Sequence, residues 1–131
     1  MYKILGWVNF AAVIIMFLPI MMQKLNTQKF NQKNNIYVRF LRNIRKLHKP
    51  IGIILFVSAL IHGFLALGAL RLHTGSLLGL LLVITGIFAF LFYKLKKKWL
   101  FVTHKILAYL LVILMIVHLV YPSAVYYLFG I

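Results

Sequence analysis

Long apolar runs separated by short basic segments limit this chain to very few folds. Four such runs, at residues 4–22, 48–70, 77–93 and 99–121, have the lengths that helices need to cross a bilayer. Because backbone N–H and C=O groups must be paired inside lipid, a continuous apolar run of this length is expected to be helical. The sequence therefore predicts an all-α fold, a four-helix transmembrane bundle that forms a single domain over residues 1–131.

The charged residues favour the same interpretation. The chain has 15 Lys and Arg and no Asp or Glu, and most of these charges lie between the apolar runs. Such a distribution suits anionic lipid headgroups rather than nucleic acid. The charge rule for membrane loops predicts a basic cytoplasmic loop at 23–47 and both termini outside, in a multi-pass protein of a prokaryotic cytoplasmic membrane. Within that loop, residues 36–47 have the pattern of an interfacial helix, with a solvated loop as the alternative.

Two of the apolar runs share one outline. HKPIGIILFVSALIH extends from His48 to His62 and HKILAYLLVILMIVH from His104 to His118, with thirteen residues between the histidines of each pair. On a helix this spacing leaves the second ring about 40° around the axis from the first and roughly 21 Å along it. The second and fourth runs are parallel in this topology. His48 is then level with His104 near the cytoplasmic face, and His62 is level with His118 near the outer face.

The missing side chains exclude much chemistry. Without carboxylates or cysteine there is no Ser-His-Asp triad, no paired-carboxylate catalysis, no iron-sulfur cluster and no thiolate zinc site. Zinc or copper held by two imidazoles would need further protein ligands, whereas haem iron needs only two axial ligands. No Cys-x-x-Cys-His motif is present, so the haem would be b-type. The sequence predicts two haem b groups stacked between the second and fourth helices, with iron ligands His48, His104, His62 and His118.

Other polar residues near these helices are candidates for supporting roles. Basic side chains placed to pair with haem propionates are Lys49, Lys105 and Arg45 at the inner end and Arg71 at the outer end. Ser58 and Thr103 could orient the histidine rings or bond their own backbone. His73, in the connection after the second run, is expected to be an exposed loop histidine, with a role toward an outer substrate or metal as the alternative.

This arrangement resembles the ferric reductase-like transmembrane domain, a family of dihaem membrane cytochromes b. The starts at His48 and His104, of the form HK-x-[IL]-[GA], are similar to the His-Arg/Lys-x-Leu-Gly start common in that family, and the resemblance covers residues 48–121. It implies transmembrane electron transfer from a cytoplasmic-side donor, through the inner and then the outer haem, to an extracytoplasmic acceptor. The acceptor could be ferric iron, oxygen or a redox protein.

The chain also departs from that family. It has four predicted spans where six are usual, and it has no nucleotide-binding fingerprint, so its donor would be a separate flavoprotein, a small reductant or quinol. The alternative function is a haem-bearing membrane anchor subunit of a quinone-linked or flavoprotein oxidoreductase complex. A haem-free scaffold or small transporter is a third possibility. No catalytic residue is predicted, and whether the chain acts as an oxidoreductase by itself stays open.

Overall fold

The computed structural model describes residues 2–29, 35–67 and 73–129, and every regular element in these ranges is a helix. The helices are α1 (Tyr2–Lys29), α2 (Asn35–Leu67), α3 (Thr74–Leu95), α4 (Lys98–Val120) and the short α5 (Ala124–Phe129). Helices α1 to α4 are each long and apolar enough to cross a membrane. The predicted all-helical architecture with four candidate spans is confirmed.

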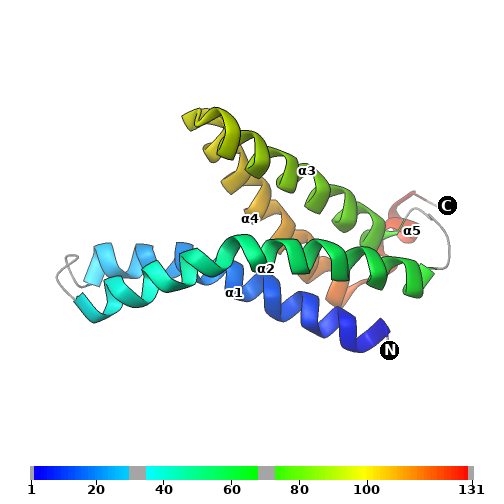
Figure 1. Cartoon of the computed structure of the whole chain (residues 1–131). Coiled ribbons are helices and arrows are strands. Elements are labelled where there is room, and N and C mark those ends of the chain that lie inside the picture. Colours follow the sequence, from blue (N-terminus) through cyan, green and yellow to red (C-terminus); the bar gives the residue numbers. More distant parts are fainter. Residues whose placement is uncertain (1, 30–34, 68–72, 130–131) are drawn as a thin grey trace.

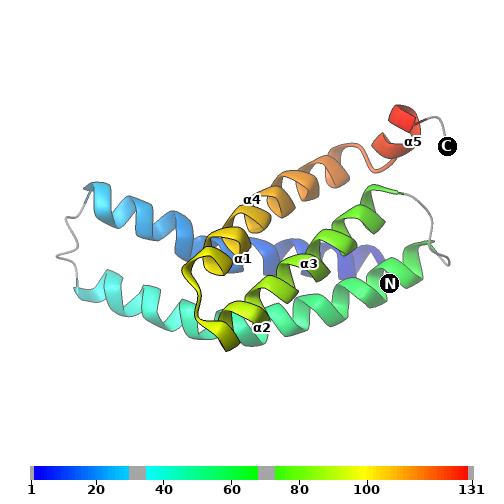
Figure 2. The same cartoon turned by 90° about the horizontal axis from the view of Figure 1, so that it is seen from above.

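The four long helices form two hairpins. Helix α1 packs along α2 and α3 packs along α4, while contacts between the two hairpins are much sparser. The hairpins cross at an angle, with the end of α1, the start of α2 and the turn between α3 and α4 toward one end of the bundle, and the start of α1 and α5 toward the other (Figures 1 and 2). Helices α2 and α4 therefore run in the same general direction, as the sequence topology requires.

A two-residue turn joins α3 to α4. Lys96 ends α3 in a left-handed conformation, with φ of 54°, and its backbone N–H donates to the Phe92 carbonyl at 2.9 Å. Lys97 is the N-cap residue of α4, and Leu100 in the first turn of α4 is fully buried. A turn this short sets how far α3 and α4 are shifted along each other, and thereby which residues of the two helices meet.

The first hairpin is longer than the sequence indicated. The basic segment predicted as a loop over 23–47 is helical wherever it is described, because α1 continues to Lys29 and α2 begins at Asn35. Pro19 and Pro50 lie inside these helices, which continue although each proline removes one backbone hydrogen bond.

Contacts between α1 and α2 explain this helical extension. The Tyr37 hydroxyl donates to the Met22 carbonyl at 2.8 Å, and Arg45 Nη2 donates to Gln23 Oε1 at 2.7 Å. Leu41 is only 5% exposed. The apolar stripe that suggested an interfacial helix thus packs, at Leu41, against protein.

The buried core lies between the levels of the histidines. It consists of Val13, Leu55, Leu111 and Met115, contributed by α1, α2 and α4. Leu55 and Leu111 each lie midway in sequence between the two histidines of their own helix. Many other apolar side chains of the four helices point outward, where lipid would contact them.

Candidate functional site

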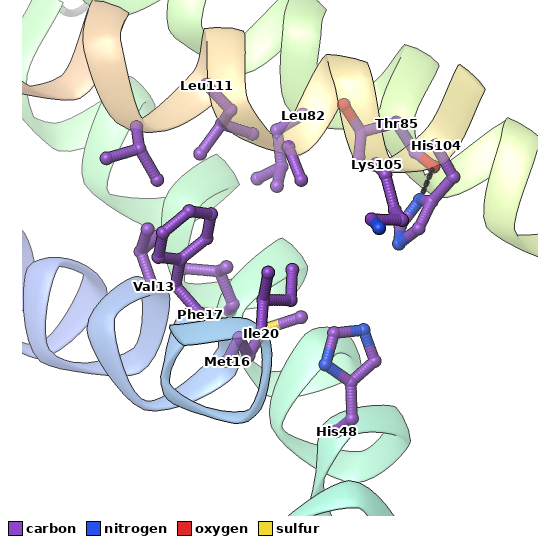
Figure 3. A pocket seen from close by; sticks show the side chains of 13 residues that line it. Val13, Met16, Phe17, Ile20, His48, Leu82, Thr85, His104, Lys105 and Leu111 are labelled. Carbon is purple, nitrogen blue, oxygen red and sulfur yellow. Dashed lines mark hydrogen bonds between the residues drawn. The ribbon is translucent and has the colours of Figure 1, made fainter. Parts of the chain in front are cut away.

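His48 on α2 and His104 on α4, here called the inner pair, face each other across the middle of the bundle (Figure 3). Their ring centroids are 6.2 Å apart and the ring planes are almost perpendicular, at 87°. Because a metal–imidazole bond is about 2 Å long, two imidazoles on opposite sides of one iron have ring centres about 6 Å apart. The inner pair has the separation that axial ligands of one haem require.

Each ring of the inner pair is also held by the other helix of its own hairpin. His104 Nδ1 lies 3.1 Å from the Thr85 carbonyl oxygen of α3, and the His48 ring lies near the backbone of Met16 in α1. A carbonyl oxygen only accepts, so the nitrogen that contacts it carries the proton. The other ring nitrogen then keeps its lone pair, which is the form that binds a metal.

An apolar cavity of about 80 Å³ adjoins the inner pair and is lined by all four long helices. Its lining residues include Val13, Phe17, Leu82, Ala108 and Val112 (Figure 3). Sites for ligands of drug size are usually about 300–1,000 Å³. A porphyrin would therefore have to push the two hairpins apart, and the contacts between the hairpins are sparser than those within each hairpin.

His62 and His118, here called the outer pair, pack against glycines at the opposite end of the bundle. A Cβ added at Gly6 would lie 3.1 Å from Cε1 of His62, and one added at Gly75 would lie 3.2 Å from Cε1 of His118. The helices thus carry histidines at two levels, with a small residue on the adjacent helix making room for each outer ring.

The two hairpins hold their histidines in the same way. In the first hairpin Gly6 contacts the outer histidine and Met16 the inner one, and in the second hairpin Gly75 and Thr85 make the corresponding contacts. The two contacting residues are ten positions apart in both hairpins, as 6 to 16 and 75 to 85. The histidine repeat of α2 and α4 was visible in the sequence, but the matching repeat of contacting residues in α1 and α3 was missed. Gly6 and Gly75 are the part of that second repeat that the sequence shows.

His118 has two further polar neighbours. Its Nδ1 lies 2.8 Å from the hydroxyl oxygen of Thr74, and its ring centroid is 6.3 Å from that of His73. The expectation that His73 is an exposed loop histidine is wrong, because this residue is partly buried and caps the N-terminus of α3. It reaches this position because α3 begins at the level of the outer pair.

The predicted propionate partners fall into different environments. Lys105 lines the cavity beside the inner pair (Figure 3). Lys49 places its Nζ 4.1 Å from the centre of the Tyr93 ring, and Arg45 bonds a glutamine side chain of α1. Arg71 lies outside the described residues. Lys105 is thus the candidate that the structure brings to the cavity.

Ser58 and Thr103, the two candidates for orienting the histidine rings, form hydrogen bonds with other groups. Ser58 donates to the side chain of Asn9 and also lies 3.2 Å from the carbonyl oxygen of Leu55, and Thr103 donates to the carbonyl of Trp99 at 3.0 Å. The hydroxyl that contacts a histidine of the outer pair belongs instead to Thr74, which the sequence analysis did not single out.

Within residues 2–29, 35–67 and 73–129, no group of three or more His, Cys, Asp or Glu side chains comes together to hold a metal ion. The inner histidines form a single pair, which suits a group that supplies its other ligands itself, whereas His118 has His73 as a further neighbour. The chain matches no protein-family model, no curated protein and no solved structure.

Proposed function

We propose that this chain is a transmembrane cytochrome b that carries single electrons between the two sides of a membrane, with one haem b at the inner pair and a second at the outer pair. The observation that supports it most directly is the 6.2 Å separation of the His48 and His104 rings, which face each other across the bundle. Haem, when bound, supplies the one-electron chemistry of its iron.

The backbone carbonyls around the inner pair support ligation of this kind. The Thr85 carbonyl accepts a hydrogen bond from Nδ1 of His104, so that Nε2 of this ring keeps its lone pair for iron. A hydrogen bond to the ring N–H also raises the basicity of the ligand. The chain has no Asp or Glu, so a backbone carbonyl takes the role of hydrogen-bond acceptor that a carboxylate often has beside a metal-bound histidine.

The surroundings of the inner pair suit an apolar macrocycle with charged substituents. Apart from His48, His104, Thr85 and Lys105, the side chains that line the cavity are apolar. Lys105 is partly buried at the same cavity and can neutralise a propionate. The buried Leu55 and Leu111 separate the inner level from the outer one.

The direction of electron flow follows from the resemblance to ferric reductase-like domains. In our proposal the donor approaches the basic end of the bundle, and the acceptor lies beyond the outer pair. Ferric iron, oxygen or a partner redox protein would take the electron. In the same proposal a separate flavoprotein or quinol supplies it.

The long basic end of the first hairpin favours a second candidate function, that of a haem-bearing membrane anchor subunit. Helix α2 is 33 residues long, about 50 Å at 1.5 Å per residue, whereas the hydrocarbon core of a bilayer is about 30 Å thick. Its exposed basic residues near this end are Arg39, Arg42, Arg45 and Lys46. An acidic flavoprotein or quinone-linked subunit could dock on this surface.

Spectroscopy of the purified protein tests the proposal. The chain is expressed with ample haem and purified in detergent, and oxidised and dithionite-reduced spectra are recorded with a pyridine haemochrome count. Two haem b per chain are expected. A folded but colourless protein would contradict the proposal and favour a scaffold or transporter. Co-purification of a flavoprotein would favour the anchor subunit over an independent electron carrier.

A further inference from the structure

Thr74, the first residue of α3, is the most buried polar side chain in the described part of the chain, at 1% exposure. Its hydroxyl oxygen lies 2.8 Å from His118 Nδ1 and 3.4 Å from His73 Nδ1. The same hydroxyl contacts the backbone carbonyl of Pro122. One small side chain therefore joins the start of α3, the end of α4 and two histidine rings.

The chemistry of these three contacts decides where the protons are. A carbonyl oxygen can only accept, so the single hydroxyl proton of Thr74 is donated to Pro122. Toward His118 the hydroxyl can then only act as an acceptor, and the proton in that contact must belong to Nδ1 of His118. Nε2 of His118 is left unprotonated, with its lone pair available.

We propose that Thr74 is the positioning residue of the outer haem site, holding His118 as the Nδ1–H tautomer so that Nε2 binds iron. This inference rests on the proposed function and deepens it. By accepting a hydrogen bond, Thr74 makes the imidazole a stronger donor to iron, as partners of metal-bound histidines generally do. The Pro122 carbonyl fixes the orientation of the Thr74 hydroxyl, because it accepts the hydroxyl proton.

The position of Thr74 explains why a side chain is needed here. At the inner level, the middle of α3 offers a backbone carbonyl to His104. At the outer level α3 is only beginning, and the first turn of a helix presents unpaired N–H groups, which cannot accept a proton from imidazole. The side-chain oxygen of Thr74, at the first helical residue, accepts this hydrogen bond instead. Gly75 beside it leaves room for the His118 ring.

The same geometry argues against His73 as the second ligand of the outer haem. The rings of His73 and His118 are 6.3 Å apart, much like the inner pair, so distance alone would allow His73 as a ligand. The Thr74 oxygen, however, lies close to Nδ1 of both rings and occupies the space that a porphyrin between them would need. His73 is therefore a neighbour of the site, and the sequence repeat leaves His62 as the second ligand in our proposal.

The test measures the midpoint potentials of the two haems separately, by spectroelectrochemistry of the purified protein, together with the haem count. Thr74→Val removes the hydroxyl at nearly constant shape, and Thr74→Ser restores it. Thr103→Val is the matched control, because the Thr103 hydroxyl bonds the carbonyl of Trp99 within its own helix.

Thr74→Val is expected to raise the midpoint potential of one haem, because a weaker imidazole donor stabilises the ferric state less. Its affinity for that haem should fall by about ten-fold or more, the usual effect of losing such a partner. Thr74→Ser should return both values toward those of the wild type. Thr103→Val should leave both haems as they are.

Failure of this inference is distinguishable from failure of the proposed function. If the wild type binds two haems and folded Thr74→Val keeps both potentials and affinities, Thr74 has no positioning role and only the inference is lost. If the wild type binds no haem, the proposed function is lost.

A second pair of variants covers the case in which Thr74→Val does not fold. His62→Ala should lose the outer haem, and His73→Ala should keep it. The opposite result would show that His73 is the ligand and would overturn the assignment.

Discussion

The rings of His48 and His104 lie 6.2 Å apart and nearly perpendicular, although the two residues belong to different helical hairpins. Each is held by the backbone of its own hairpin, at Met16 and at Thr85. The separation between the rings is therefore set by how the two hairpins cross. This relationship connects the packing of the bundle to its proposed capacity to bind haem.

Replacing either residue of the inner pair should remove one haem. For His48→Ala or His104→Ala we expect one haem b per chain by pyridine haemochrome where the wild type binds two, because iron loses an axial ligand and no third histidine is among the described residues that line the cavity. Thr103→Val, next to His104, is a control that should keep two. Retention of both haems in His48→Ala would show that the inner ligands are misassigned.

Gly6 and Gly75 should be sensitive to the addition of a single methyl group. In Gly6→Ala or Gly75→Ala the new Cβ would lie only 3.1 or 3.2 Å from the adjacent outer histidine, so the ring must shift. We expect weaker binding of the outer haem, measured by its retention during size-exclusion chromatography.

The matched controls for these glycines are Gly63→Ala and Gly79→Ala, where nothing lies within 4 Å of the new atom. Alanine at an open helical position should stabilise the fold by about 0.5–1 kcal/mol. Equal effects on haem retention at all four positions would argue against specific contact between glycine and imidazole.

Leu55→Ala should destabilise the protein even without haem. Leu55 is 4% exposed and belongs to the buried core, and such truncations typically cost about 2–5 kcal/mol. Leu60→Ala on the same helix is the control, because Leu60 is 56% exposed and should cost much less. Thermal unfolding in detergent, followed by circular dichroism, compares the two. Similar melting temperatures would mean that the hairpins do not pack through Leu55.

Tyr37→Phe should loosen the basic end of the first hairpin. The variant loses the hydrogen bond to the Met22 carbonyl, worth roughly 0.5–1.5 kcal/mol. We expect faster trypsin cleavage at the basic residues near this end, with the haem spectrum unchanged because the inner pair lies elsewhere. Tyr109→Phe, which keeps its ring contact with Phe17, serves as the control. Unchanged cleavage in Tyr37→Phe would show that other contacts hold this end.

The helices and the histidine repeat were accessible from sequence because they depend on local properties. An apolar run of a given length in lipid has one stable backbone conformation, and spacing along a helix sets which residues share a face. The four candidate spans, and the two levels of histidines on α2 and α4, follow from these rules. The sequence left residues 36–47 open between an interfacial helix and a solvated loop, and burial of Leu41 and the bond of Arg45 to Gln23 favour the helix.

What surrounds the histidines was decided by tertiary structure. The contacts of Gly6, Gly75 and Thr85 with the rings depend on how far one helix of a hairpin is shifted along the other, which the turns and the core set together. The placement of Thr74 and His73 beside His118 depends in addition on where α3 begins. Helical periodicity describes one helix at a time, whereas these contacts form between helices. The sequence by itself therefore determined the four spans and the histidine repeat. Only the packing of the helices determined which residues contact each histidine ring.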